Sequence, residues 1–123
     1  MGPHKNLLVW QKGMLLTKKI YALTTQYPPT ETFGLVSQMR RCAVSIPSNI
    51  AEGYGRGSNK ELVHFLYVAK GSANELDTQL ILSRELGYIT DEKYSEISEL
   101  NEEVNKMISS LILKRNVVVA EPT

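Results

Sequence analysis

Two histidines and one cysteine are the residues from which this chain could build a metal site or a nucleophilic centre. Glu61 and His64 form a Glu-x-x-His sequence on a predicted helix, which is the spacing found in di-iron four-helix bundles. Such a site needs a second Glu-x-x-His and two further glutamates, and His4 precedes the first predicted helix without such a partner. We therefore expect an exposed His64, with Glu61 engaged at the start of its helix, and neither a metal nor another cofactor.

The other catalytic candidates are also isolated. A serine-histidine-acid arrangement would have to use His64, and no strand-to-helix turn that would expose a nucleophilic serine is visible. Glu102 and Glu103 are adjacent, so their carboxylates diverge on a helix and suit solvation rather than acid-base chemistry. Cys42 falls on the apolar flank of a predicted helix, as is typical of an inert core thiol. We expect that the protein is not an enzyme.

A glycine-rich segment, GYGRGSNK at 53–60, has the composition of a phosphate loop. It lacks the Gly-Lys-Ser/Thr of a Walker motif, and Ser58 stands where a dinucleotide fingerprint needs its third glycine. Two interpretations remain. Free amides at the start of a helix, together with Arg56 and Lys60, could contact an anion, or the segment is a plain turn between helices.

Helical spacing accounts for almost the whole chain. Apolar residues recur every three or four positions in four segments, at about 8–27, 31–53, 59–86 and 91–115. The four stripes are Val9, Gly13, Leu16, Ile20, Leu23 and Tyr27; Val36, Met39, Ala43, Ile46 and Ile50; Leu62, Leu66, Ala69, Ala73, Leu76 and Leu80; and Ile97, Leu100, Val104, Met107 and Leu111. Short connections between them predict a single all-α domain over 1–123, folded as an antiparallel up-down-up-down four-helix bundle.

Proline sets the boundaries in the first half of the chain. Pro28-Pro29 ends the first predicted helix, because proline disfavours helical dihedrals in the residue before it. Thr30 is the expected cap of the second helix, with Glu31 in its first turn. Pro47 lies inside that helix, and because the apolar stripe runs straight through it we expect a kink rather than a break.

Capping residues set the boundaries in the second half. Ser58 and Glu61 have the order and spacing of a capping box at the start of the third helix. Gly87 is the candidate residue just past its end. The tail from Asn116 to Thr123 is expected to be short and frayed, and its VVVA run at 117–120 is the one β-like stretch.

The overall composition is that of an ordinary globular protein. The chain has 123 residues, of which 42% are hydrophobic and 22% charged, and a core of this size needs no disulfide. No apolar run approaches the ~20 residues of a membrane span, and the amino terminus lacks the apolar region of a signal peptide. We expect a cytoplasmic protein that does not contact a membrane.

The charge is divided unevenly along the chain. Residues 1–60 hold eight basic and two acidic residues, a net of +6, whereas residues 61–123 hold six and eleven, a net of −5. This split is compatible with a surface that faces nucleic acid, with head-to-tail association of subunits, or with charges that interleave on folding. If a basic surface binds nucleic acid, the residues to test are Lys12, Lys18, Lys19, Arg40, Arg41 and Arg56.

Two patterns favour self-association. On the second predicted helix Arg41, Ser45, Ser48 and Glu52 form an outer stripe of mostly short polar side chains, which suits either solvent or another subunit. Several helices also carry apolar residues outside their stripe, namely Trp10, Tyr21, Phe65, Val68 and Ile81. Some of these broaden the core, and the remainder would form a patch of a size that monomers seldom expose. We therefore expect a homo-oligomer.

The run from Gln38 to Gly53, QMRRCAVSIPSNIAEG, resembles the signature of four-helix-bundle proteins encoded by intervening sequences in bacterial 23S rRNA genes. Further similarity lies at Val9-Trp10-Gln11-Lys12 and Leu86-Gly87-Tyr88, so that the resemblance covers about residues 6–112. Within this motif Asn49 joins the outer polar stripe as a candidate interface residue. Gly13 departs from the alanine that the family usually shows, which slightly weakens the first helix.

Relatives of that family include the accessory variability protein of diversity-generating retroelements, a ring-forming bundle that binds reverse transcriptase and nucleic acid. The resemblance therefore implies a homopentameric ring. Our leading hypothesis is a non-enzymatic ring-forming protein whose basic surface binds RNA or a nucleic-acid-processing partner. The alternative is a structural homo-oligomer with no nucleic-acid ligand. A small-molecule pocket at the bundle axis is a third possibility, for which the sequence shows no converging polar residues.

Overall fold

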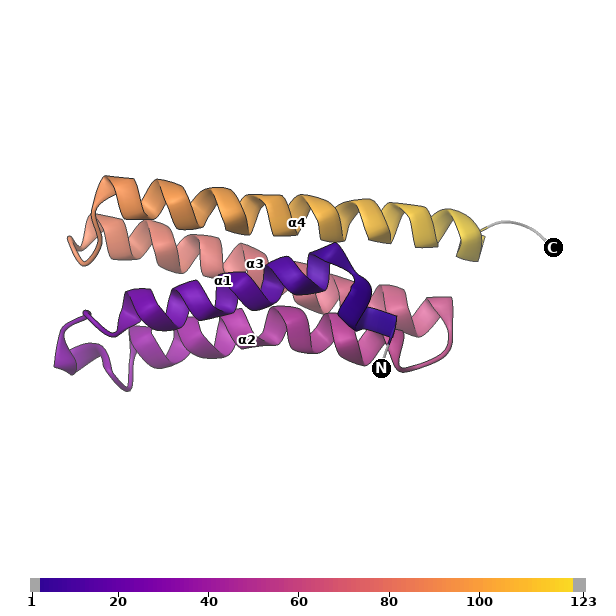
Figure 1. The fold of residues 1–123 in the computed structure, drawn as a ribbon, viewed down its shortest axis with the longest axis horizontal. Helices are drawn as coiled ribbons and strands as arrows, with labels where there is room; N and C mark the ends of the chain where they lie inside the picture. Colours follow the sequence, from indigo (N-terminus) through magenta and orange to yellow (C-terminus); the bar gives the residue numbers. More distant parts are fainter. Residues whose placement is uncertain (1–2, 121–123) are drawn as a thin grey trace.

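The computed structural model describes residues 3–120 and, within them, the side chains of residues 4–116. It consists of four α-helices, α1 (Leu8–Thr24), α2 (Leu35–Tyr54), α3 (Asn59–Glu85) and α4 (Asp91–Ala120), with short 3-10 turns η1 (Pro3–Asn6) and η2 (Pro29–Glu31). Successive helices run in opposite directions (Figure 1), and residues 3–120 contain no strand. The predicted all-α four-helix bundle is confirmed, and the helix directions agree with the up-down-up-down topology.

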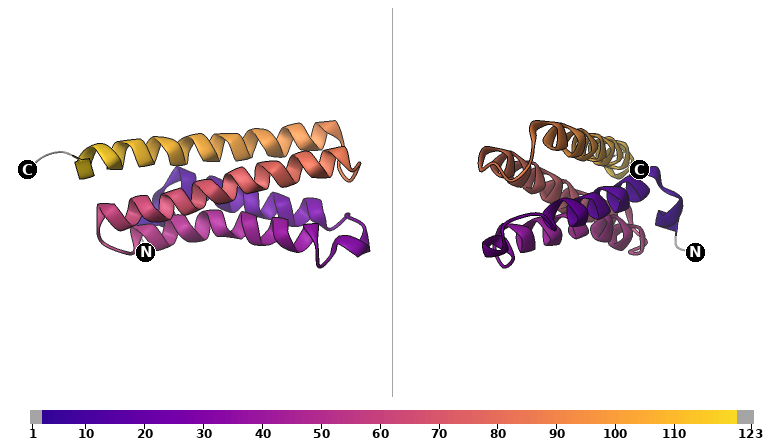
Figure 2. Two further views of the ribbon diagram at one scale, coloured as in Figure 1. Left: turned by 180° about the vertical axis from the view of Figure 1, so that it is seen from behind. Right: turned by 60° about the vertical axis from the view of Figure 1, so that its left-hand side comes forward.

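Each helix packs against its neighbours in sequence, and α1 closes the bundle against α4. Seen from behind, α3 lies between α2 and α4 (Figure 2). The predicted stripes point to the common axis, and their central members are fully buried: Leu16, Ile20, Met39, Ala43, Ile46, Ile50, Leu66, Ala69, Ala73, Leu76, Leu80 and Val104. Burial of these stripes is the main favourable contribution to folding. No helix among the described residues is long and apolar enough to cross a membrane.

Pro47 is accommodated at the contact between α1 and α2. The helix continues through it, as expected. Because proline has no N–H, the carbonyl of Ala43 loses its helical donor. The hydroxyl of Thr17 on α1 lies 3.0 Å from that carbonyl oxygen and 2.8 Å from the carbonyl oxygen of Gly13, so its one hydrogen is within reach of either acceptor. Helix α1 therefore offers a donor to the carbonyl of Ala43 that proline leaves without one.

The α1–α2 connection differs from the prediction. Helix α1 ends at Thr24 rather than at 27, because Pro28 has no N–H to donate to the carbonyl of Thr24. Helix α2 begins at Leu35 rather than at 31, so Thr30 is not its cap. Instead, Glu31 accepts a hydrogen bond from the backbone N–H of Leu35 (3.3 Å) from outside the helix.

The other helix ends follow the sequence signals more closely. Ser58 caps α3 by accepting from the N–H of Glu61 (3.2 Å). Gly87 has φ +79°, and the bonds from its N–H and that of Tyr88 to the carbonyls of Arg84 and Ser83 complete a Schellman motif. Helix α4 continues to Ala120 instead of ending at 115, because neither glycine nor proline occurs between 91 and 120. Of the predicted frayed tail, 116–120 are therefore helical and 121–123 lie outside the described residues.

Cys42 lies at the contact between α2 and α3. Its side chain is 6% exposed, and the thiol donates to the backbone carbonyl of Ser72 (2.9 Å). Burial, and to a smaller extent the nearby Glu75 carboxylate, raise the pKa of the Cys42 thiol to about 12. The predicted core position of Cys42 is confirmed. The thiolate is the nucleophilic form of cysteine, so a raised pKa predicts low reactivity.

Two glycines give opposite predictions for alanine. In Gly13→Ala the new Cβ would lie 3.6 Å from Ile46 and Pro47, an ordinary contact, so the higher helix propensity of alanine should raise the free energy of unfolding by about 1 kcal/mol. In Gly53→Ala the Cβ would lie 3.1 Å from the Cβ of Phe65 and 3.3 Å from the carbonyl oxygen of Leu62. Backbone atoms cannot yield easily, so we expect a loss of about 1–2 kcal/mol. Urea unfolding followed by circular dichroism measures both, and stabilisation by Gly53→Ala would contradict the close contact.

The thiol pKa predicts slow labelling of Cys42. At pH 8 only about one folded molecule in ten thousand carries a thiolate, so Ellman's reagent should react at least 100-fold more slowly than in urea. Because the folded-state pKa lies above the unfolded value of about 8.5, this thiol's contribution to stability is complete below that pH and is lost as pH rises toward 12. Equal labelling rates with and without urea at pH 8 would show that the thiol is accessible in the folded protein.

Candidate functional site

The two histidines and the glycine-rich segment are the parts of the chain that suggested a metal, catalytic or anion-binding site. His64 is exposed on α3, while Glu61 beside it lies at the capped helix end. The ring of His4 packs edge-on against Trp10, with centroids 5.2 Å apart. Within residues 3–120 no three His, Cys, Asp or Glu side chains gather as a metal would require.

The segment at 53–60 is the turn between α2 and α3. Gly57 has φ +84°, a left-handed conformation that glycine adopts without strain. Arg56 lies in this turn and contacts both helices. Its Nε is 2.9 Å from the carboxylate of Glu52 on α2, and its guanidinium is 5.0 Å from the ring of Phe65 on α3. This arrangement favours the interpretation as a plain turn between helices.

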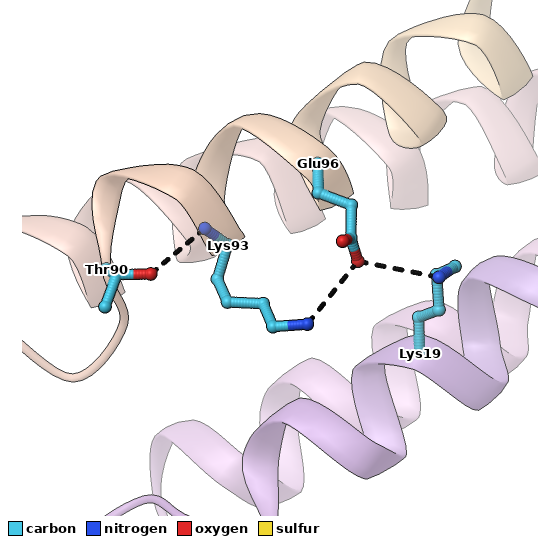
Figure 3. Close-up of polar contacts among 4 residues, drawn as sticks. All are labelled: Lys19, Thr90, Lys93 and Glu96. Carbon is cyan, nitrogen blue, oxygen red and sulfur yellow. Dashed lines mark hydrogen bonds and ion pairs between the residues drawn. The ribbon is translucent and has the colours of Figure 1, made fainter.

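Two of the six candidate basic residues lie on α1 where it faces α4. Lys12 forms an ion pair with Glu103, and Lys19 Nζ lies 3.5 Å from the carboxylate of Glu96 (Figure 3). These contacts join the basic half of the chain to its acidic half. For these two residues the charges interleave within one chain, and neither cation faces outward unpaired.

Arginine side chains stack on aromatic rings where helices meet. Arg40 on α2 lies 4.7 Å above the ring of Tyr21 on α1, and its Nε donates to the hydroxyl of Thr24 (2.9 Å). The same kind of contact joins α3 to α4 and α4 to α2, through Arg84 on Tyr94 (4.1 Å) and Arg115 on Tyr54 (5.9 Å). Sequence reasoning missed these contacts, because each joins residues on different helices.

Arg41 is the arginine that has neither an acidic nor an aromatic partner among the described residues. It is exposed on the outside of α2, beside a groove of about 280 Å³ that also includes Ser45, Ser72 and Glu75. Lys18 is likewise exposed on α1, with no ion pair in the described part of the chain. The six candidate cations therefore do not form one continuous basic surface.

The predicted polar stripe of α2 divides into two groups. Ser45 and Asn49 are half-buried against α3: the Ser45 hydroxyl lies 2.8 Å from that of Ser72, and Asn49 Nδ2 donates to the carbonyl of Ser45 (2.7 Å). Arg41, Ser48 and Glu52 are exposed. Residues 45 and 49 lie at the edge of the stripe, where only the position of α3 decides whether a side chain is exposed.

Helix α3 adds residues that the stripe on α2 could not indicate. Adjacent to α2, it exposes Val68 (39%) and Leu82 (45%) together with His64 and Glu75. We define the α2–α3 face as the exposed outer residues of these two helices: Gln38, Arg41, Ser48, Glu52, His64, Val68, Glu75 and Leu82. Other apolar residues outside the predicted stripes, namely Phe65, Ile81 and Trp10, are half-buried and broaden the core, as was expected for some of them.

A crystal structure of a protein of unknown function from the S23 ribosomal protein family of Bacteroides thetaiotaomicron has a similar fold, with a TM-score of 0.78. The two sequences are 29% identical over 85% of this chain and 98% of that one. No curated protein sequence matches the chain. The family model of the 23S rRNA-intervening sequence protein matches residues 5–110, a range that includes the motif at 38–53. The chain therefore belongs to the 23S rRNA-intervening sequence protein family.

Proposed function

We propose that the protein is a non-enzymatic, self-associating bundle in which the α2–α3 face of one copy contacts a different, acidic face of the next copy, so that the copies close into a ring. The observation that carries the proposal is Arg41, an exposed arginine without a partner among the described residues. Arginine is enriched in protein interfaces, where its planar guanidinium forms several hydrogen bonds at once. Resemblance to ring-forming relatives suggests five subunits.

The surroundings of Arg41 also suit an interface. Val68 and Leu82 supply apolar area, and Arg41 beside the groove supplies a cation that a carboxylate of the next copy could bind. Ser45, Asn49 and Ser72 already bond one another, so the groove would present satisfied polar groups to a neighbouring subunit. An interface needs such satisfied groups, because unpaired buried ones are costly.

A specific observation favours RNA as a ligand of the same protein. The family is named for an rRNA intervening sequence, and Lys18 is a cation on α1 without an ion pair among the described residues. Lys18 lies outside the α2–α3 face, so assembly would leave it accessible on every copy. With rRNA as its ligand, the protein would be cytoplasmic. The homo-oligomer without a nucleic-acid ligand remains the competing function.

Self-association predicts that the wild-type protein sediments as a multiple of 13.8 kDa at micromolar concentration and moderate salt. Arg41→Glu and Val68→Glu should each weaken assembly at least tenfold, because a buried interface tolerates neither an unpaired carboxylate nor the loss of a central arginine. Matched controls on α1 are Lys18→Glu and Leu15→Glu, which change exposed residues away from this face. A single wild-type species of 13.8 kDa would reject the proposed function.

RNA binding predicts a steep dependence of affinity on salt. Each phosphate contact with single-stranded RNA adds about −0.7 to the slope of log K against log salt. Lys18→Ala should reduce that slope by about 0.7 without changing the sedimentation of the protein. Lys12→Ala is the matched control, because Lys12 is already paired with Glu103. If 23S rRNA fragments do not bind at low salt while assembly persists, the competing function without a nucleic-acid ligand is correct.

A further inference from the structure

A groove of about 360 Å³ lies between α1 and α4, beside the α3–α4 turn. The last turns of α1 form one side of the groove and the first turns of α4 form the other, and the Schellman motif brings Ile89 and Thr90 to the same end of the bundle. This volume lies within the range of small-molecule sites, which begins near 300 Å³. The groove is at the side of the bundle. At the bundle axis, the sequence showed no converging polar residues.

Apolar side chains line the inner part of the groove. Ile97 is 2% exposed and belongs to the core, and Leu23 and Ile89 are half-buried against it. Because the packed core holds these residues, this surface is already formed without a ligand. A flat apolar group could cover it without moving a helix.

Two lysines share one carboxylate at the opening of the groove (Figure 3). The Oε2 atom of Glu96 lies 3.5 Å from Lys19 Nζ and 3.7 Å from Lys93 Nζ, both longer than a usual hydrogen bond. These three residues are the charged groups that line the groove, and they leave a net charge of +1. Farther along the same helices, Lys12 and Glu103 pair one to one. The excess cation at the groove is therefore a local feature of this opening.

We propose that the groove binds a small amphipathic anion, a flat apolar body that carries one carboxylate, sulfonate or phosphate group. The anionic group lies between Lys19 and Lys93, and the apolar body covers Leu23, Ile89 and Ile97. The carboxylate of Glu96 competes for the same two ammonium groups, and since it is about half exposed it can turn toward solvent. This site is independent of the α2–α3 face and of self-association.

The test compares two probes of the same shape, 1-naphthoate and its neutral analogue 1-naphthamide, by chemical-shift titration of the 15N-labelled protein at pH 7. We expect 1-naphthoate to bind at least fivefold more tightly and to shift the amide signals of residues that line the groove. Adenosine monophosphate is the third probe, and it reports whether a phosphate monoester on a nucleoside is accepted as well as an aryl carboxylate.

Variants of the lining residues separate this site from adsorption to apolar surface. Lys19→Ala and Lys93→Ala should each weaken 1-naphthoate binding about threefold to tenfold, whereas Glu96→Gln should strengthen it, because a competing carboxylate is removed. Lys93→Ala keeps the helix cap, since the donor to Thr90 is the backbone N–H of residue 93 (3.1 Å, Figure 3). Lys18→Ala, outside the groove, is the matched control for charge.

A fourth variant blocks the groove without changing the charge. Ala22 is exposed and lines the groove, so Ala22→Trp should fill it and abolish binding while the unfolding midpoint stays within a few degrees of wild type. Equal affinity for naphthoate and naphthamide, or naphthoate binding that survives Ala22→Trp, would overturn the proposal. Weaker binding by Glu96→Gln would also overturn it, because that result would make Glu96 a ligand-binding group rather than a competitor.

Discussion

Each helix of this bundle must bury one apolar stripe against the same axis, and every other feature depends on that constraint. A helix with two neighbours has an inner face, two flanks and an outer face. The inner faces hold residues such as Leu16, Ile46, Leu66 and Val104, which are fully buried. Polar and charged residues are therefore restricted to the flanks, where they meet a neighbouring helix, and to the outer faces, where they meet solvent or a partner.

The flanks hold several of the cationic side chains of the chain. Lysines of α1 pair with glutamates of α4, and arginines lie over aromatic rings at the contacts between helices. A guanidinium can bury its planar face on a ring while its edges remain hydrated, which makes it suitable for such half-exposed positions. The high positive charge of the first sixty residues therefore does not produce a single basic surface. Of the six candidate cations, Arg41 and Lys18 have no partner among the described residues and lie on two different outer faces, and this separation is why assembly and RNA binding are assigned to different residues.

The α1–α4 contact combines apolar and charged side chains at the end beside the α3–α4 turn. Leu23 of α1, Ile97 of α4 and Ile89 of the turn line the groove there, and Lys19, Lys93 and Glu96 border it. Both lysines approach the carboxylate of Glu96 (Figure 3). These three ionised groups remain partly exposed, so they do not close the groove as packed apolar side chains would, and its charge follows from the residues that border it.

The helices, their buried stripes and the caps at Ser58 and Gly87 were determined by the sequence itself, because hydrogen bonds within a helix and side-chain periodicity are local properties. Membership of the family could also be inferred from the motif at 38–53. The α1–α2 connection was misjudged because Glu31 caps α2 from outside the helix, a contact that no spacing rule specifies. Helix α4 ends later than expected for a different reason. The absence of glycine and proline between 91 and 120 favours a helix more strongly than three successive valines oppose it.

Only the tertiary structure decided whether each polar residue is exposed or paired with another side chain. Positions 45 and 48 are both serine and lie about one helical turn apart. Ser45 forms a hydrogen bond with Ser72 across the α2–α3 contact, whereas Ser48 is exposed. Lys18 and Lys19 are adjacent, yet Lys19 faces Glu96 of α4. A rotation of 100° around a helix separates consecutive residues, and what lies opposite them is set by helices distant in the sequence. Hydrophobic periodicity fixes which side of each helix is buried, whereas the pairing of charges depends on which helices become neighbours.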